Sequence, residues 1–410
     1  MILYSSNLSS GISALINLNP ALFFICIFFF LWWIPAKIDI GLLCIFLSIL
    51  SIPKSKINWS RSINSREFSV LALLLLNIIS FLLSDSAGPG FIYVINMAVG
   101  GYIYLLIVRS KFISKLINFV YLAWFMGIIF HVTFFCINVY NRGQAIEFFN
   151  RYGDQILKVP NDIAYFMISV PVSMAVVKLF FRRAWILNAS IIIAIAFIYA
   201  SLKFGGRSTL LYSLLLIISV LVDGRRSFKK LLIIVGGFLC IYLYLNYESP
   251  EPTIYRLLNL SLFCDGRIPQ WILALEIGIK NFWIGAGSLE FGNQWGNYIS
   301  NPINNSCFYI DSRAIGWPHN LLLEQFAFSG IFSFVLLLYL LSIIFLSFFK
   351  YYLKNTRKNY FFSSAVLIYI SSCLLDLTFY RLWVSICFFM ILHAVEFSFS
   401  NEYLRNSNET

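Results

Sequence analysis

Long apolar runs recur along this chain from one end to the other, and they restrict its fold more than any other feature. A run of about 18 or more apolar residues is long enough to cross a lipid bilayer as an α-helix. Within the bilayer, backbone polar groups must find partners inside the protein, which only helices and closed barrels provide. The alternating polar and apolar residues that are typical of barrel strands do not extend over long segments here. The sequence therefore predicts an all-α, polytopic membrane protein.

The apolar runs predict about twelve transmembrane helices and one large loop. Residues 1–246 are predicted to hold the first nine helices, residues 247–319 the loop, residues 320–400 the last three helices, and residues 401–410 a polar, frayed tail. The predicted helices lie at about 16–35, 38–53, 68–84, 91–108, 116–139, 161–180, 184–202, 207–222, 231–247, 320–349, 360–379 and 382–399.

Basic residues gather in short loops that are two predicted helices apart, around residues 54–66, 109–115, 178–183, 225–230 and 350–358. An excess of Lys and Arg marks the cytoplasmic loops of a membrane protein. This distribution predicts that both termini are cytoplasmic and that the large loop lies on the opposite, outer side. It also accounts for the net charge of +12, so the charge does not indicate a nucleic-acid partner.

The large loop is predicted to contain a helix as well as irregular segments. The stretch "RIPQWILALEIGIKNFWIGAG" (267–287) has a proline near its start and glycines near its end, which predicts a helix lying on the membrane surface. The stretch "FGNQWGNYISNPINNS" (291–306) is rich in Gly and Asn, which predicts turns. Cys264 and Cys307 both lie in this loop, and the sequence leaves open whether they form a disulfide.

Two arginines on the outer side stand at the starts of predicted helices. Arg207 follows two glycines in "KFGGRSTLL", where the N–H groups of the next helix favour an anion and the guanidinium can bind phosphate oxygens. Arg267 begins the surface helix, with Asp265 two residues before it. The alternatives are an interfacial arginine that reaches lipid headgroups and an Asp–Arg pair that only caps a helix.

A third feature is "GWPHNLLLEQF" (316–326), which holds one of the three histidines of the chain. Imidazole titrates near neutral pH, so His319 can take a proton from a hydroxyl or, once charged, stabilise an anion. Asn320 and Glu324 are four residues apart on one helical face and can together hold a sugar. The alternatives are a histidine of the interfacial belt and a glutamate paired with an arginine.

The sequence contains no P-loop, no His/Asp/Glu cluster with metal-ligand spacing and no D-x-D pair, so no metal and no other cofactor is expected. Three motifs, in the order "GGRSTLL", "GRIPQWILALEIGIKNFWIGAG" and "PHNLLLEQFAFSGIFSF", resemble the O-antigen polymerase and ligase superfamily. These are bacterial membrane glycosyltransferases with a GT-C-like helical fold. The resemblance covers about residues 200–345, and the first 180 residues match only in hydropathy.

The resemblance implies transfer of a glycan from undecaprenyl pyrophosphate to an acceptor glycan, with inversion, at the periplasmic face of the bacterial inner membrane. Arg207 and Arg267 would hold the pyrophosphate, and His319 would activate or bind the acceptor hydroxyl. The further candidate substrate contacts are Asn320, Glu324, Asp265 and Arg313. The partners that the resemblance implies are the two glycans, the lipid bilayer, a chain-length regulator and a flippase.

Both branches of the superfamily can carry a His-Asn element, so the motif does not separate them. A polymerase extends lipid-linked repeat units, whereas a ligase transfers the glycan to lipid A–core. The stretch "PHNLLLEQFAFSGI" is more similar to polymerases, which makes a polymerase the predicted function. A flippase for the same lipid-linked units is the alternative from another class, but ionisable residues would be expected deep within several of its helices. The early predicted helices here are nearly free of charge.

Overall fold

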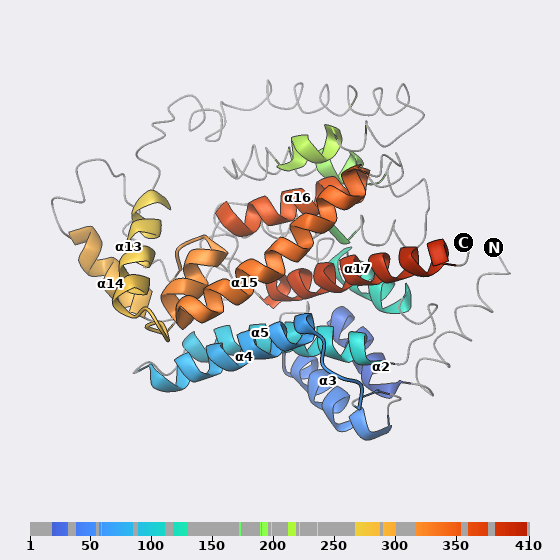
Figure 1. Ribbon diagram of the computed structural model, residues 1–410, viewed down its shortest axis with the longest axis horizontal. Helices are drawn as coiled ribbons and strands as arrows, with labels where there is room; N and C mark the ends of the chain where they lie inside the picture. The colour runs from blue at the N-terminus through green and yellow to red at the C-terminus, as the bar shows by residue number, and fades with distance from the viewer. Residues whose placement is uncertain are drawn as a thin grey trace, which may run out of the picture. The chain divides into compact units, whose positions relative to one another are not determined.

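The structure is a computed structural model, and in the part of the chain that it describes the regular structure is helical (Figure 1). One isolated antiparallel bridge joins Ile57 to Ser110. The described residues are 19–31, 38–54, 57–58, 60–84, 89–110, 118–129, 172–173, 189, 191–195, 198, 212–218, 221, 236, 267–287, 290–300, 317–353, 360–375 and 382–407.

The described helices overlap segments that the sequence predicts as membrane spans. Their bounds are α2 Pro20–Leu31, α3 Ile38–Leu50, η2 Ile52–Lys54, α4 Ser65–Leu83, α5 Pro89–Arg109, α13 Arg267–Lys280, α14 Glu290–Ser300, α15 Leu321–Leu353, α16 Tyr360–Leu375 and α17 Leu382–Ser407. Among the described residues, Ser65–Leu83, Phe91–Arg109 and Leu321–Ser347 are long and apolar enough to cross a membrane. Most of residues 161–247 lies outside the described part, so the expected number of about twelve spans stays a prediction.

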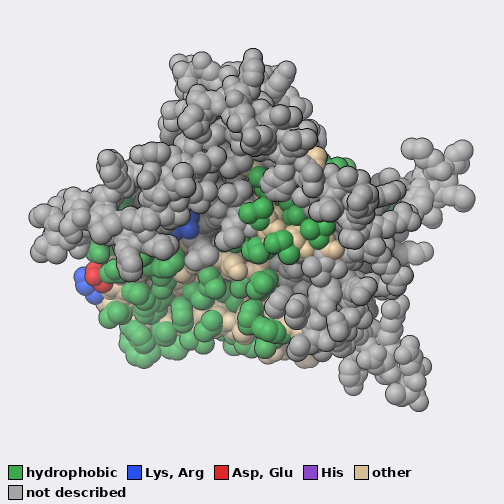
Figure 2. All heavy atoms as spheres, turned by 90° about the horizontal axis from the view of Figure 1, so that it is seen from above, with side chains coloured by type: hydrophobic (Ala, Val, Ile, Leu, Met, Phe, Trp, Pro, Cys, Tyr) green, Lys and Arg blue, Asp and Glu red, His purple; other side chains and the backbone are tan. Residues whose placement is uncertain are grey.

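Large apolar side chains cover the exposed faces of the long helices. They include Phe68, Leu75 and Leu82 of α4 and Phe332 and Val335 of α15. Figure 2 shows hydrophobic side chains dominating the described part of one face of the molecule, with few charged side chains among them. Such faces suit lipid acyl chains, which supports the prediction of a membrane protein.

The structure divides into two compact units, which are described separately. The first comprises Met1–Arg61, Ile103–Leu257 and Tyr351–Ala365, and the second Ser62–Tyr102, Leu258–Lys350 and Val366–Thr410. In the first unit α2 packs against α3, and Ser48 Oγ donates a hydrogen bond of 2.8 Å to Ala21 O. Asn58 N donates to Arg109 O over 2.8 Å, which brings together the ends of two basic loops. This agrees with the prediction that both loops lie on one side of the membrane.

In the second unit α15 is not one continuous span. Gly330 has φ 77° and ψ −174°, so the helix is broken there into residues 321–329, the first segment, and residues 331–353, the second segment. The chain changes direction at this break (Figure 1). The predicted helix at 320–349 is therefore right in extent, but the prediction of an unbroken span is wrong because Gly330 adopts a conformation closed to residues with a Cβ.

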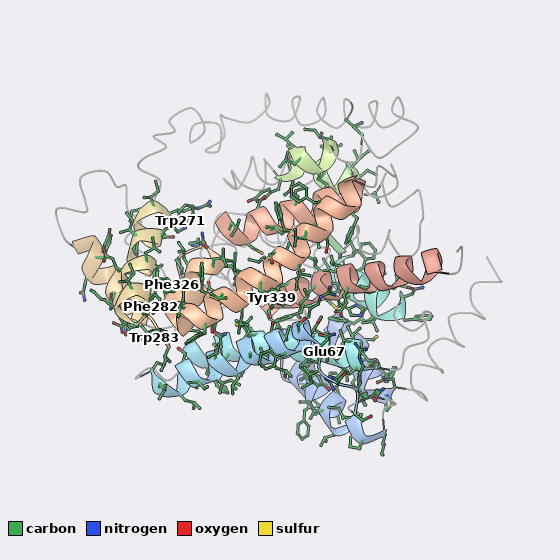
Figure 3. All side chains as sticks on the ribbon, in the orientation of Figure 1. Glu67, Trp271, Phe282, Trp283, Phe326 and Tyr339 are labelled. Carbon is green, nitrogen blue, oxygen red and sulfur yellow. The ribbon has the colours of Figure 1, made fainter. Side chains whose placement is uncertain are left out.

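The loop after α13 fills the break in α15 and satisfies the backbone groups that the break releases. Ala286 N donates to Ala327 O over 2.9 Å, Gly287 N to Phe328 O over 3.0 Å, and Ile331 N to Phe282 O over 2.8 Å. Trp283 stacks on Phe332 with 5.7 Å between ring centroids, and Phe282 meets Phe326 edge to face (Figure 3). Irregular backbone at membrane depth needs such internal partners, so α13 and α15 are held together through main-chain bonds.

A buried polar network attaches the first segment of α15 to α4 and α5. Asn77 Nδ2 donates to Gln325 Oε1 over 3.0 Å, and Ser329 Oγ donates to Asn77 Oδ1 over 2.7 Å. Gln325 Nε2 also donates to the Tyr93 hydroxyl, and Ser80 Oγ donates to Phe328 O. Hydrogen-bonded side chains of this kind fix one register between helices in a membrane.

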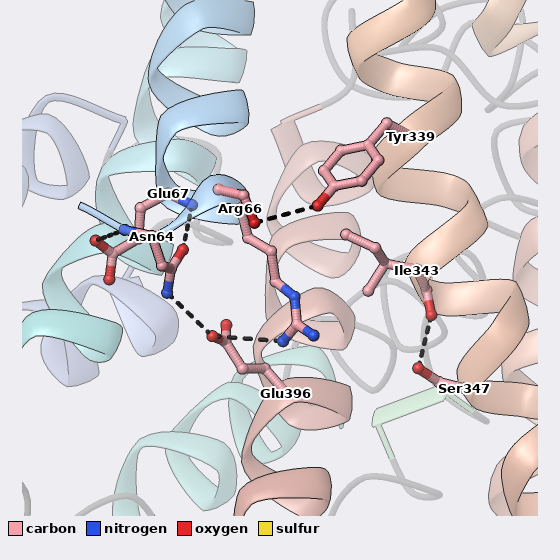
Figure 4. Close-up of polar contacts among 8 residues, drawn as sticks. Asn64, Arg66, Glu67, Tyr339, Ile343, Ser347 and Glu396 are labelled. Atoms are coloured by element: carbon pink, nitrogen blue, oxygen red, sulfur yellow. Dashed lines mark hydrogen bonds and ion pairs between the residues drawn. The ribbon is translucent and has the colours of Figure 1, made fainter. Parts of the chain in front are cut away.

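The N-terminus of α4 shows why that helix begins where it does (Figure 4). Asn64 Oδ1 accepts from Glu67 N over 2.8 Å, and Glu67 Oε2 accepts from Asn64 N over 3.4 Å, which makes a capping box. Asn64 Nδ2 also donates to Glu396 Oε1 of α17 over 3.4 Å, and Arg66 lies 3.5 Å from the same oxygen. These contacts attach the start of α4 to α17.

Two predictions about less apolar segments are wrong. Residues 290–300 form α14 rather than turns, because Phe291, Trp295 and Tyr298 follow a helical spacing and stack on one another, with centroid distances of 6.2 Å and 6.1 Å. The polar tail that was expected to fray is instead helical as far as Ser407, the end of α17. Its residues include good helix formers, so the helix propagates beyond the predicted span.

Candidate functional site

The surface helix predicted from Arg267 onward is present as α13, and it runs parallel to the first segment of α15. A Cβ placed on Gly278 would lie 2.4 Å from the Phe326 ring, so the two helices are in close contact there. One turn later on α13, Phe282 O accepts from Ile331 N. Both helices therefore end near the Gly330 break. Figure 3 shows Phe326 of α15 between Trp271 and Phe282 along α13.

This parallel arrangement brings two of the predicted catalytic residues to the same end of the second unit. At about 1.5 Å per residue, Gln270 lies about 12 Å before the contact of Gly278 with Phe326, and Leu321, the first residue of α15, lies about 8 Å before it. Arg267 lies about one turn, or 5 Å, beyond Gln270. His319 lies two residues before Leu321. The N-terminal ends of α13 and of the first segment of α15 therefore lie toward the same end of the second unit, and helix N-termini suit an anion.

His319 has an unusual backbone conformation. Its φ is 53°, and it is the only residue other than glycine with a positive φ in the described part of the chain. A residue with a Cβ in this left-handed region is strained by about 1–2 kcal/mol. The imidazole meets the Trp317 ring edge to face at 5.8 Å and is partly exposed. Strain of this kind is kept where the surrounding structure fixes it, often at functional sites.

Asn320 supplies the contacts that fix the chain immediately after His319. Its Oδ1 accepts from Leu322 N and Leu323 N, both over 3.1 Å, which makes Asn320 the N-cap of α15. Its Nδ2 donates to Leu374 O in the last turn of α16 over 2.7 Å. Because backbone groups already engage both ends of this amide, Asn320 holds the histidine loop in place. Its role in binding a sugar stays a prediction.

We expect Asn320→Ser and Asn320→Ala to differ in stability. Serine keeps a capping oxygen but cannot reach Leu374, so the loss is about 1 kcal/mol, whereas alanine loses the cap as well, for a total of about 2 kcal/mol. Apparent melting temperatures of the purified proteins in detergent should fall in the order wild type, Asn320→Ser, Asn320→Ala. An Asn320→Ala protein that melts with the wild type would show that neither contact stabilises the fold.

Glu324 lies one turn into α15, and its side chain is completely buried. It is close enough to Cys373 of α16 for the two groups to interact electrostatically. Glu324 therefore faces the interior of the second unit. It does not present a carboxylate at the surface near the start of α13, at Arg267, or near the residue that precedes α15, His319. The predicted contact between Glu324 and a substrate stays a prediction, while its burial favours a role inside the helix packing.

Gln270 is a candidate that the sequence did not single out. It lies on the buried face of α13 and has only 4% of its surface exposed. Its Oε1 is buried without a hydrogen-bond partner among the described residues. A buried acceptor of this kind needs an explanation, and its place about one turn after Arg267 makes it a candidate substrate contact. The amide in "RIPQW" was the only sequence signal, and it is a weak one.

The other predicted site residues, Arg207, Asp265 and Arg313, lie outside the described residues, as do Cys264 and Cys307. Their predicted roles therefore stay predictions. Within the described part, no group of three or more His, Cys, Asp or Glu side chains is placed to hold a metal ion. No protein-family model matches the chain, and no curated protein matches it.

Proposed function

We propose that this protein is a membrane glycosyltransferase that polymerises lipid-linked repeat units of a bacterial surface polysaccharide, as O-antigen polymerases do. The observation that carries the proposal is the parallel pairing of α13 with the first segment of α15, because it brings Arg267 and the strained His319 to one end of the same unit. The ordered motifs that resemble the O-antigen polymerase and ligase superfamily support the same function. Helices long and apolar enough to cross a membrane are compatible with this function.

In the proposed reaction, the acceptor hydroxyl oxygen attacks the anomeric carbon of the donor sugar from the face opposite the pyrophosphate. The bond between the anomeric carbon and the pyrophosphate oxygen breaks, and undecaprenyl pyrophosphate leaves with the bonding electrons. His319 takes the proton from the acceptor hydroxyl. Arg267, the N-terminus of α13 and Arg207 stabilise the negative charge that grows on the leaving pyrophosphate. Arginines in this role require no metal ion or other cofactor.

The remaining candidates hold the sugars or the loop in this scheme. Asp265 lies two residues before Arg267 and Arg313 lies six residues before His319, and both are proposed to contact the glycans. Gln270 joins them as a buried amide. Asn320 keeps His319 in its left-handed conformation. The enzyme would work on the periplasmic side of the inner membrane, beside the flippase that delivers its substrate and the regulator that sets chain length.

The experiment that tests the proposal is an electrophoretic analysis of lipopolysaccharide from a strain that lacks this protein. Loss of a polymerase leaves lipid A–core carrying one repeat unit. Loss of a ligase leaves bare core, with long chains on the lipid carrier, and loss of a flippase traps lipid-linked units in the cytoplasmic leaflet. We expect the first result, and either of the others would replace the polymerase proposal.

Complementation of the same strain with Arg267 variants tests the site. We expect Arg267→Ala to reduce chain growth by about 10²–10³-fold, because one donor to the developing charge is lost. Arg267→Lys should recover part of the activity, since lysine keeps the charge but not the bidentate geometry. Immunoblots of membrane fractions must show equal amounts of each variant. Full-length chains from Arg267→Ala would remove Arg267 from the proposed site.

A further inference from the structure

The exposed face of α13 carries a narrow apolar stripe. Ile268, Ile272, Leu275 and Ile279 are between 36% and 66% exposed, and at 100° per residue they fall within an arc of about 60°. The opposite face of the helix is buried and includes Leu273, Ala274 and Ile277. A water-exposed helix would be polar on this side, so the stripe is an apolar surface that the described part of the chain leaves exposed.

The stripe continues into the lipid-facing surface of a membrane span. Just after α13, Phe282, Trp283 and Ile284 are also exposed, by 40% to 63%. Trp283 stacks at 5.7 Å on Phe332, an exposed residue at the start of the second segment of α15. That segment belongs to one of the helices long enough to cross the membrane. In Figure 1, α13 runs across the direction of α4, as a helix lying along a membrane surface would.

Polar groups lie at the edges of the stripe and on the helix beside it. Arg267 and Lys280 stand at the two ends of α13, and Glu276 lies on one flank. α14 packs against α13, and burial and then the Glu276 carboxylate raise the pKa of Tyr298 on α14. The exposed side chains of α14, such as Asn293 and Asn297, are polar and suit water.

We propose that α13 and the Phe282–Ile284 segment form an interfacial anchor, with the apolar stripe inserted among the acyl chains of the outer leaflet. Amphipathic helices insert to a depth of about 5–10 Å, which is where Trp283 would join the aromatic belt. Arg267 and Lys280 match the phosphates of the lipid headgroups. The occupant of the stripe is bilayer lipid, because the stripe is continuous with the lipid-facing surface of α15 and is bounded by cations.

This anchor does not depend on glycosyl transfer, but it bears on that proposal through Arg267. An interfacial α13 holds its first residue at headgroup depth, where the phosphates of any lipid-linked substrate also lie. The anchor therefore determines the depth at which the candidate anion site lies in the headgroup region. It would do so for a ligase or a flippase as well as for a polymerase.

Photo-crosslinking in lipid nanodiscs tests the anchor. A benzophenone amino acid is placed at position 272 or 279 of the full chain in phosphatidylethanolamine and phosphatidylglycerol, and adducts are identified by mass. We expect lipid adducts at both positions to exceed those at position 293 by about tenfold, since Asn293 is exposed on the polar face of α14. Position 293 thus serves as the matched control for exposure without insertion.

Each other outcome overturns the proposal. Adducts between two copies of the chain at positions 272 and 279 would assign the stripe to a dimer interface. Lipid adducts that are equally frequent at position 293 would show random contact with the nanodisc. The absence of adducts at 272 and 279, with normal lipid adducts from a benzophenone at Leu75 of the α4 span, would show that the stripe faces water.

Discussion

Gly330→Ala is expected to prevent stable folding of the second unit, and Gly285→Ala to do nearly the same. Both glycines have φ near 80°, where an added Cβ costs about 1–2 kcal/mol. A Cβ on Gly330 would lie 2.3 Å from Trp283 O, and one on Gly285 would lie 2.3 Å from the Phe328 carbonyl carbon. Because both obstacles are backbone, relief requires the two segments to separate, which breaks the main-chain bonds across the α15 break. We therefore expect a loss of at least about 3 kcal/mol.

The measurements are the yield of each variant in membranes and the apparent melting temperature in detergent. Gly296→Ala is the matched control, because Gly296 lies within α14 and nothing would come within 4 Å of its added Cβ. Alanine inside a helix is better than glycine by about 0.5–1 kcal/mol, so this control should melt at the wild-type temperature or slightly above it. Gly330→Ala or Gly285→Ala proteins that melt like the wild type would show that α13 and α15 are not joined as described.

The membrane helices could be predicted from sequence because their signals are local. For α4, the apolar run is preceded by Asn64 and Glu67, which form the capping box seen in the structure. For α13, the start at Arg267 and the end before two glycines were correctly predicted. In each of these cases the residues that determine a boundary lie within one or two turns of it.

The break in α15 was missed because its cause is not local. Gly330 stands in a long apolar run, where a single glycine usually continues a transmembrane helix. What opens the helix is the loop that contains Gly285, which lies 45 positions earlier in the chain and supplies replacement partners to Ala327, Phe328 and Ile331. The only sequence signal for the break was a glycine in each segment, Gly285 and Gly330. These glycines predict a break only when the two segments are known to be in contact.

The missed helix α14 has a related explanation. Its Gly and Asn residues have low helix propensity, which favoured the prediction of turns. Phe291 and Trp295 are nonetheless buried, and stacking of the aromatic rings along one face offsets the poor propensity. Burial depends on the neighbouring α13, which propensity does not include. The helical spacing of the three aromatic residues was visible in the sequence, but the neighbouring surface of α13 was not.

In the candidate site, too, local sequence signals identified the residues, whereas contacts between distant residues determine where they lie. The sequence identified Arg267 and His319 as residue types suited to an anion and a hydroxyl, but it placed them 52 positions apart with no geometric link. Arg267 and His319 lie toward the same end of the second unit because Gly278 contacts Phe326 and because α13 and the first segment of α15 both end near Gly330. The strain at His319 was likewise not predictable, since the next residue, Asn320, is held by a contact with α16 that lies 54 positions away in sequence.

Substitution of His319 is expected to separate activity from stability. His319→Gly removes the imidazole and should reduce chain growth by about 10²–10⁴-fold, the usual contribution of a general acid–base group. The same change relieves the positive φ, so the protein should be as stable as the wild type or up to about 1 kcal/mol more stable. His319→Ala also lacks the imidazole but keeps the strain, and it should therefore be equally inactive and less stable than His319→Gly.

The two variants are measured together, as melting temperatures in detergent and as polysaccharide length after complementation of the deletion strain. A purely structural histidine would give a different pattern, in which activity follows stability and His319→Gly restores what His319→Ala loses. Long chains made by the glycine variant would show that the backbone conformation, and not the imidazole, is what the protein requires at this position. A stable and inactive His319→Gly would instead show that the strain is retained because the imidazole works there.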